Sequence, residues 1–145
     1  MSEKLTLPTD VSIITTYRCQ MRCKMCNIWE FPSDVKKEIE AKDLEILPQL
    51  KFANITGGEP FQRMDLEDIV EVAFKRAERV VISTSGWHYE RALKLAERFP
   101  NIGIRVSIEG LAERNDDLRG RPGGFDRGLR LLLALSEMGV KDIGF

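Results

Sequence analysis

All three cysteines of the chain lie within eight positions, from Cys19 to Cys26, with the spacing Cys-x3-Cys-x2-Cys. Cysteine thiolates are common ligands of structural zinc and the usual ligands of iron–sulfur clusters. A disulfide would leave one cysteine over, and a zinc site would need a fourth ligand, for which His88 is the only histidine. The motif favours an iron–sulfur cluster, in which three thiolates leave one iron of four open to another ligand.

Three basic residues lie beside and between these cysteines, namely Arg18, Arg22 and Lys24. Their charges make the stretch too polar for three thiols that simply pack in a core. Because a nearby cation lowers the pKa of a thiol, we expect them to favour the thiolate form. They would also offset part of the negative charge of a cluster.

A second unusual stretch is TGGEP, at 56–60. Gly57 and Gly58 carry no side chain, so the backbone can approach a ligand closely there. Pro60 fixes the exit from the turn, and Glu59 would present a carboxylate that can meet a ligand ammonium group. The same residue types also mark ordinary turns, so this stretch alone is compatible with both interpretations.

The rest of the chain alternates between strand and helix patterns. Strands are expected at 11–16, 51–56, 79–84, 102–108 and 141–145. Helices are expected at 66–77 after an Asp65 cap, at 88–98, at 125–138 before Gly139, and, more weakly, at 41–50. The segments 31–43 and 112–124 read as long polar loops. This alternation predicts an α/β fold in which βα units build a parallel sheet.

The unusual stretches all follow predicted strands. The cysteines follow the first strand, TGGEP ends the second, STSG (83–86) the third and SIEG (107–110) the fourth. The carboxyl ends of parallel strands meet at one edge, where open sheets and barrels form their ligand sites. We therefore expect one site at this edge.

These motifs together resemble the radical S-adenosylmethionine (SAM) superfamily, over essentially the whole chain. The segment RVSIEGLAERNDDLRG looks most like the branch that contains molybdopterin-precursor synthases and peptide-modifying maturases. The resemblance implies a 4Fe–4S cluster on Cys19, Cys23 and Cys26, with the fourth iron chelated by the amino and carboxylate groups of SAM. Met25 stands where the family often has an aromatic residue.

The resemblance also implies a set of cofactor-binding residues: Gly57, Gly58, Glu59, Ser85, Ser107, Glu109 and Arg119. The first three match the motif that contacts the methionine amino group. Ser107 and Glu109 correspond to positions that hold the ribose and methionine portions. Arg119 is the first candidate for the SAM carboxylate and Arg121 the second, because an arginine fork suits a carboxylate.

For the fold, the resemblance implies a truncated partial (β/α) barrel of about four βα units plus the start of a fifth strand. Residues 1–145 would be the N-terminal portion of a radical SAM core domain, with the C-terminal strands and any extension absent. The implied activity is reductive cleavage of SAM to a 5′-deoxyadenosyl radical, which abstracts hydrogen from an unidentified small molecule or peptide. An external electron donor is implied. The alternative is a non-catalytic iron–sulfur or zinc-binding module.

The composition is that of an ordinary globular protein, with 43% hydrophobic and 31% charged residues and a net charge of −1. The charges are interleaved, so neither nucleic acid nor a membrane is an expected partner. No signal peptide is recognisable, and clustered cysteines suit a reducing, cytoplasmic location. The predicted strands read as apolar on both faces, so we expect an exposed apolar patch that makes the chain a homo-oligomer.

Overall fold

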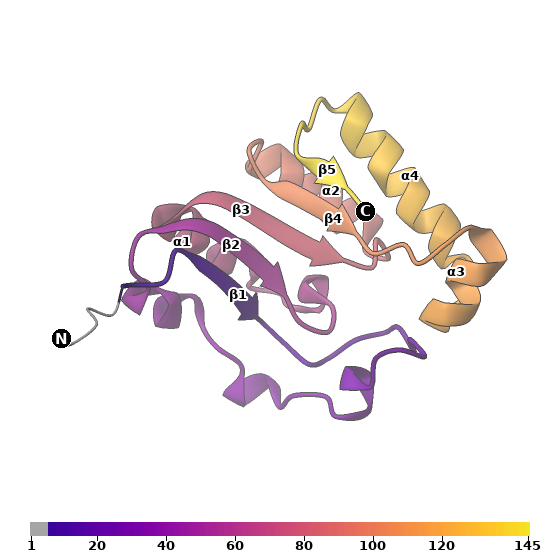
Figure 1. The fold of residues 1–145 in the computed structure, drawn as a ribbon, viewed down its shortest axis with the longest axis horizontal. Helices are drawn as coiled ribbons and strands as arrows, with labels where there is room; N and C mark the ends of the chain where they lie inside the picture. The colour runs from indigo at the N-terminus through magenta and orange to yellow at the C-terminus, as the bar shows by residue number, and fades with distance from the viewer. Residues whose placement is uncertain (1–5) are drawn as a thin grey trace.

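The computed structural model describes residues 6–145, so Met1, where the expected domain begins, lies outside the described residues. Five strands form one parallel sheet in chain order: β1 (Asp10–Ile14), β2 (Leu50–Thr56), β3 (Ala77–Thr84), β4 (Gly103–Val106) and β5 (Ile143–Gly144). The sheet curves but does not close (Figure 1). The predicted α/β class and partial barrel are confirmed, and each strand overlaps its predicted range.

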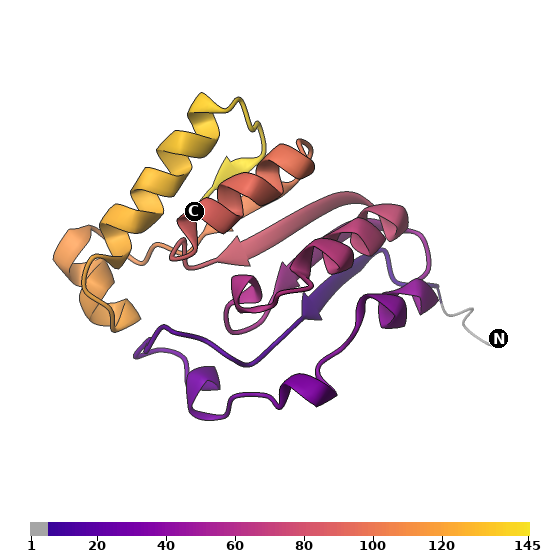
Figure 2. The ribbon, with the colours of Figure 1, turned by 180° about the vertical axis from the view of Figure 1, so that it is seen from behind.

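Three of the helices pack on one face of this sheet: α1 (Leu66–Arg76), α2 (Tyr89–Arg98) and α4 (Gly124–Glu137) (Figure 2). The core lies between them and the sheet. Its centre is a row of isoleucines in register, Ile55, Ile82 and Ile104, each 0% exposed. The apolar stripes of the helices complete it, as the 3.6-residue periodicity predicts. Within residues 6–145, no helix has both the length and the apolar character needed to cross a bilayer.

The predicted loop at 112–124 contains a fourth helix, α3 (Ala112–Arg119), so that prediction is wrong for its first part. Its sequence AERNDDLR has no apolar stripe, and its only buried residue is Asn115, so periodicity gives no sign of a helix. The weak helix expected at 41–50 is shorter, a 3-10 helix η3 (Ala41–Ile46). Three more 3-10 turns occur: η1 (Ile28–Glu30), η2 (Val35–Lys37) and η4 (Pro60–Gln62).

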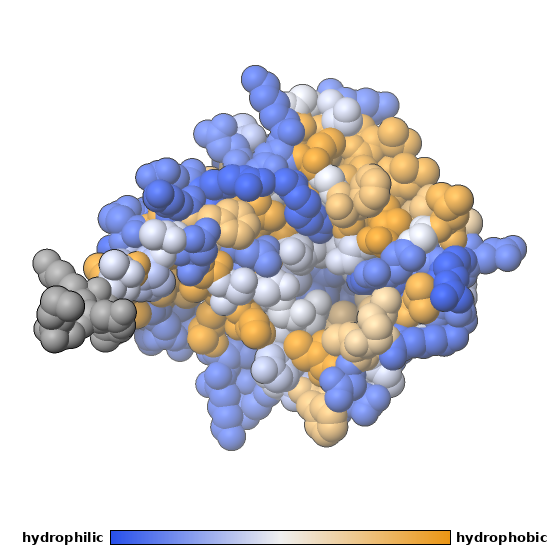
Figure 3. Space-filling model, viewed as in Figure 1, coloured by the Kyte–Doolittle hydropathy of each residue, from blue (hydrophilic) through white to orange (hydrophobic). Residues whose placement is uncertain are grey.

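The face of the sheet opposite the helices is open and largely polar, which contradicts the expectation that the strands are apolar on both faces. Ser12, Asn54, Ser83 and Arg105 point to this side, in alternation with the buried residues of the core. The middle of this face is white and blue in Figure 3, and orange gathers mainly toward α4 and β5. The reason given for a homo-oligomer therefore fails for this face, and oligomerisation stays a prediction.

Charged residues close one end of the open face. Asp142, just before β5, accepts hydrogen bonds from Arg79 Nε on β3 (2.8 Å) and Arg105 Nη2 on β4 (2.5 Å). The bond from Arg79 and the bond from Arg105 outweigh the effect of burial and lower the pKa of Asp142 to about 2. This cluster ties the start of β5 to two neighbouring strands at the end away from the predicted site.

Candidate cofactor site

A pocket lies at the carboxyl edge of strands β1 to β4, where the sequence predicts a site. Its cavity volume is about 170 Å³, smaller than the roughly 300–1,000 Å³ common for small-molecule sites. It is lined by Cys19, Cys23, Met25, Cys26, Ile28, Trp29, Thr56, Gly57, Gly58, Ser83, Thr84, Ser85, Ser107, Glu109 and Arg119. The three cysteines and every residue of the predicted cofactor-binding set except Glu59 are among them, whereas Arg121, the second arginine candidate, is not.

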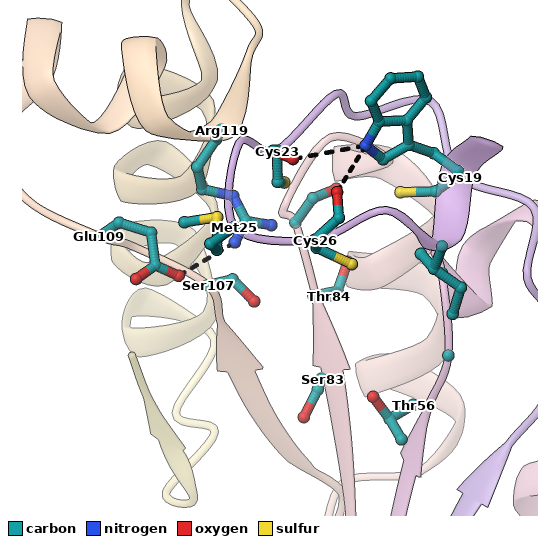
Figure 4. Close-up of a pocket in the computed structure, with 15 residues that line it drawn as sticks. Cys19, Cys23, Met25, Cys26, Thr56, Ser83, Thr84, Ser107, Glu109 and Arg119 are labelled. Atoms are coloured by element: carbon teal, nitrogen blue, oxygen red, sulfur yellow. Dashed lines mark hydrogen bonds and ion pairs between the residues drawn. The ribbon is translucent and has the colours of Figure 1, made fainter.

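The side chains around this pocket come from distant parts of the chain. In Figure 4, Glu109 and Arg119 lie on one side and Cys19 on the other, with Cys26 between them. Thr56 and Ser83 lie deeper, near the strand ends. The pocket therefore combines thiols, hydroxyls, a carboxylate and a guanidinium at one edge of the sheet.

One side of the cysteine loop is held by the end of α3. Arg22 N donates to Arg119 O at 3.3 Å, and Lys24 N donates to Leu118 O at 2.8 Å. Gly120 makes this approach possible, because a Cβ there would stand 2.1 Å from Arg22 O and its φ is +65°. The helix that the sequence did not reveal is thus what positions the cysteine loop from one side.

A buried carboxylate holds the chain just before the first cysteine. The side chain of Glu38 is 3% exposed and accepts two hydrogen bonds from Arg18, at Nε and Nη2, both at 2.9 Å. Thr16 Oγ1 and Ser33 Oγ each donate to it at 2.5 Å. Burial raises the pKa of Glu38, but these hydrogen bonds outweigh it and hold the pKa at about 2. Segment 33–38 is thereby fastened beside Cys19.

The basic residues of the motif do not activate the thiols as expected. Each already has a partner: Glu38 for Arg18, backbone carbonyls for Arg22 and Asp117 for Lys24. Burial raises the pKa of both Cys19 and Cys23, and the Arg119 guanidinium offsets only part of that effect. The expectation that these cations favour the thiolate is therefore wrong for Cys19 and Cys23 in the metal-free chain.

The two glycines of the TGGEP turn let it lie against the chain that leads into the cysteines. Gly58 N donates to Thr16 O at 2.7 Å, and a Cβ on Gly58 would stand 2.4 Å from Arg18 O. A Cβ on Gly57, whose φ is +143°, would stand 2.4 Å from Thr16 O. Both glycines also line the pocket, so the turn contacts the cysteine segment and the cavity at once.

Glu59 lies beneath the pocket, with 0% exposure. Its carboxylate accepts hydrogen bonds from Thr84 Oγ1 and Ser85 N, both at 2.8 Å, from Phe61 N at 3.2 Å, and from Ser85 Oγ. In this arrangement it supports two residues that do line the cavity, Thr84 and Ser85. Its contact with a ligand ammonium stays a prediction.

Arg119 presents a buried nitrogen without a partner. Its side chain is 12% exposed, and Nη1 donates to Glu109 Oε1 at 3.2 Å, but Nε has no hydrogen-bond partner. A buried unpaired donor calls for an explanation, and a ligand acceptor in the pocket supplies one. Arg121, the second candidate, points away: it donates to Gln20 O at 3.0 Å and stacks 4.0 Å from the centroid of the Trp87 ring.

Some lining residues were missed in the sequence. Ile28 and Trp29 form an apolar pair two residues after the third cysteine, in an otherwise polar segment, and that pair was the available signal. Thr56, Ser83 and Thr84 belong to the TGGEP and STSG stretches that the sequence placed at this edge, but they were not among the predicted cofactor-binding residues.

The thiols fit a cluster better than a single metal ion. The three cysteines are free and line the same cavity. Within residues 6–145, no three histidine, cysteine, aspartate or glutamate side chains are gathered closely enough to hold one ion. In a four-iron cluster each thiolate binds a different iron, so the sulfurs need not converge on one point. His88, the only histidine of the chain, does not line this pocket.

Comparisons with known proteins agree with the motifs. The family described as "Radical SAM superfamily" matches residues 13–145. The Fe-coproporphyrin III synthase of Methanosarcina barkeri is 31% identical over 138 residues, covering 87% of this chain and 33% of that protein. The mycofactocin maturase MftC of Mycolicibacterium smegmatis is 33% identical over 135 residues, covering 88% of this chain and 34% of that protein. The chain spans about a third of the length of the curated relatives it matches.

Solved structures share the fold. Streptococcus suis SuiB, in a structure with bound S-adenosylmethionine, matches with a TM-score of 0.78 and 22% identity. The match covers 93% of this chain and 33% of SuiB. SuiB bound to its precursor peptide SuiA gives the same TM-score and covers 94% of this chain. At this identity the likeness concerns the fold alone.

Proposed function

The chain belongs to the radical S-adenosylmethionine superfamily, and from this premise we propose that its pocket binds a 4Fe–4S cluster and SAM. One observation carries the proposal: three free thiols and an unpaired arginine nitrogen line one cavity at the carboxyl edge of a parallel sheet. When bound, these cofactors supply one-electron cleavage of the SAM sulfonium, which gives methionine and a 5′-deoxyadenosyl radical that takes hydrogen from a substrate.

The chain's own residues would bind and orient these two cofactors. Cys19, Cys23 and Cys26 hold the cluster through three thiolates. Arg119 has Nε available for the SAM carboxylate, and the charge-assisted bond would satisfy an otherwise unpaired donor. Glu109 is already paired with Arg119 and would keep that guanidinium in place.

Backbone and hydroxyl groups from the other strand ends would complete the SAM contacts. Gly57 and Gly58 would present backbone groups to the methionine end of SAM, and Ser107 would offer a hydroxyl to the ribose side. Ser85 would join them by exchanging one of its present hydrogen bonds, to Glu59 or from Gln20. Glu59 would meet the amino group only if it exchanged one of its present hydrogen bonds for it. Its more direct contribution is to hold Ser85 and Thr84 at the pocket wall.

Relatives include a maturase and a coproporphyrin synthase, so we keep both a peptide and a small molecule as candidate substrates, with an external electron donor. We propose that residues 1–145 are the N-terminal portion of a radical SAM core domain. A cytoplasmic location suits its three free thiols.

The cluster assignment is tested by replacing each of Cys19, Cys23 and Cys26 with alanine, followed by anaerobic reconstitution. We expect each variant to lose the four-iron absorption and at least one iron per chain, because the sequence holds no other cysteine. An intact four-iron spectrum in Cys26→Ala would contradict the assignment. Zinc in place of iron, or a cluster spectrum indifferent to SAM, would favour the non-catalytic module.

The SAM assignment is tested with Arg119→Gln in cluster-loaded protein. Removal of a charge-assisted hydrogen bond should weaken SAM binding by roughly 10- to 100-fold, while iron content stays near that of the parent chain. Arg114→Gln is the matched control, since Arg114 lies exposed on the same helix and does not line the pocket. Equal affinities in both variants would remove Arg119 from the site.

A further inference from the structure

Two side chains that carry no thiol hold the backbone carbonyls of all three cysteines. We propose that Arg22 and Trp29 form a clamp, the Arg22–Trp29 clamp, which fixes the spacing of Cys19, Cys23 and Cys26 before a cluster binds and slows its loss afterwards. The inference rests on the proposed function, because it concerns the loop that would carry the cluster. Its residues are positioning residues and supply no ligand atom.

The contacts of the clamp reach each cysteine in turn. Arg22 Nη1 donates to Cys19 O at 2.9 Å and to Met21 O at 2.8 Å. Trp29 Nε1 donates to Cys26 O at 2.8 Å and, more weakly, to Cys23 O at 3.4 Å. Figure 4 draws the latter two contacts as dashed lines that end on the carbonyl oxygens of Cys23 and Cys26.

The two halves of the clamp are joined to each other. The Arg22 guanidinium lies 4.9 Å from the centroid of the Trp29 ring, within the range of a cation–π contact. Arg22 belongs to the first part of the loop and Trp29 to the turn η1 that follows the third cysteine. Their contact therefore closes the loop on itself and leaves the thiols free to face the pocket.

Other anchors hold different parts of the loop. The backbone bonds to α3 come from Arg22 N and Lys24 N, so they fix the middle of the motif. Among the hydrogen bonds of residues 6–145, those that reach Cys19 O and Cys26 O come from the side chains of the clamp. The outer two cysteines thus owe their backbone positions to Arg22 and Trp29.

A fixed loop should matter for a cluster because the ligands then need not be ordered at the moment of binding. When one bond between an iron and a cysteine thiolate breaks, a thiol held at a set position can bind that iron again. Without the clamp, the outer cysteines would move independently, and each released ligand would have time to diffuse away. The clamp is therefore expected to act on cluster retention, which can be measured without any substrate.

Two substitutions separate the parts of the clamp. Trp29→Phe keeps an aromatic ring beneath Arg22 but removes the indole N–H. Arg22→Gln keeps a donor but removes the cation. Trp87→Phe is the control for the first, because Trp87 is the other tryptophan and does not line the pocket. Lys24→Gln is the control for the second, since it removes one positive charge from the same loop while its amine contacts only Asp117.

The first measurement uses the metal-free chain. Amide hydrogen exchange across residues 19–29 should be about fivefold faster in Trp29→Phe and in Arg22→Gln, the effect of losing about one hydrogen bond. Exchange in β2 and β3 should not change. The second measurement follows iron release to a chelator after anaerobic reconstitution, and a similar fivefold acceleration is expected in both variants.

The outcomes separate this inference from the proposed function. A parent chain that takes up no four-iron cluster would refute the proposed function, and the exchange measurement would still decide whether the clamp orders the loop. A normal cluster in the parent chain, with unchanged exchange and unchanged iron release in both variants, would refute the clamp alone. Equal acceleration in Trp87→Phe or Lys24→Gln would also refute it, because the effect would then follow from any lost tryptophan or charge.

Discussion

The helix-covered sheet and the cysteine segment, residues 15–40, are ordered by different forces. The sheet rests on apolar burial, as in the isoleucine row that includes Ile55 and Ile82 at 0% exposure. The cysteine segment has only the short turns η1 and η2, and it is held by side chains that bind backbone carbonyls and by the buried Glu38. The first should respond to lost volume, and the second to lost charge or a single lost donor.

The largest effect should come from the core of the sheet. Ile82→Ala removes a side chain with 0% exposure, which should lower the free energy of unfolding by about 2–5 kcal/mol. Because the cysteine segment docks on this sheet, both regions should unfold together in a denaturant titration. The control is Ile14→Ala, on the open face at 51% exposure, where a much smaller loss is expected. Equal losses would mean that the two faces of the sheet are packed equally tightly.

Acid should affect the cysteine segment before it affects the core. Glu38 has a pKa of about 2 in the fold against an ordinary 4.5, so its contribution is present above pH 4.5 and is lost as the pH falls toward 2. That contribution is about 2–3 kcal/mol at neutral pH, allowing for the partial exposure of Arg18.

The measurement for Glu38 is hydrogen exchange or proteolysis of segment 33–38 as a function of pH. The segment should loosen between pH 4.5 and 2 in the parent chain and be loose at every pH in Glu38→Gln. Glu40→Gln, at an exposed position with 62% of its side chain accessible, should keep the parent profile. A flat profile in the parent chain would show that Glu38 does not fasten the segment.

A smaller effect should follow from the contact between α3 and the cysteine loop. Gly120→Ala puts a methyl group 2.1 Å from Arg22 O and strains a φ of +65°, the strain alone costing about 1–2 kcal/mol. Gly123→Ala meets the same kind of strain at φ +79° but nothing within 4 Å. Both variants should lose stability to denaturant, Gly120→Ala the more because of its additional clash with Arg22 O, and only Gly120→Ala should lose iron uptake. Equal iron uptake would separate cluster binding from the docking of α3.

The smallest effect should come from the exposed pair of Lys24 and Asp117. Their side chains are 61% and 53% accessible, and such pairs contribute less than about 1 kcal/mol. Lys24→Gln should leave the free energy of unfolding within about 0.5 kcal/mol of the parent value, and added salt should abolish even that difference. A larger loss would mean that charge, and not backbone docking, holds the middle of the loop.

The sequence predicted what periodicity and motif spacing encode. The strands, the helices α1, α2 and α4, and the meeting of the motifs at one edge follow from alternation and from the rule for parallel sheets. It did not reveal α3, whose residues lack an apolar face. It also misjudged the open face of the sheet, because runs such as RVVIST look apolar although alternate residues point to opposite sides.

Some of the residues that line the pocket could be named from the sequence, and others could not. The thiols, the glycines and Arg119 follow from the motif, and they line the pocket. The burial of Glu59 and the contacts of Trp29 depend on residues far apart in the chain or on backbone groups, such as Thr84 with Glu59 and the Cys26 carbonyl with Trp29. Local composition does not indicate the burial of Glu59 or the contacts of Trp29, so these are visible only in the folded structure.

The docking of the cysteine loop on the end of α3 has a consequence for biosynthesis. The cysteines occupy positions 19–26, whereas the carbonyls and glycine that receive the loop lie at 118–120. At a synthesis rate of roughly 5–20 residues per second, the receiving residues leave the ribosome roughly 5–20 s after the thiols. During that interval β1 and the thiols are already outside the ribosome while their partner does not yet exist. The nascent chain therefore presents its three thiols to iron carriers or oxidants for seconds before α3 can receive the loop and Cys23 can be buried.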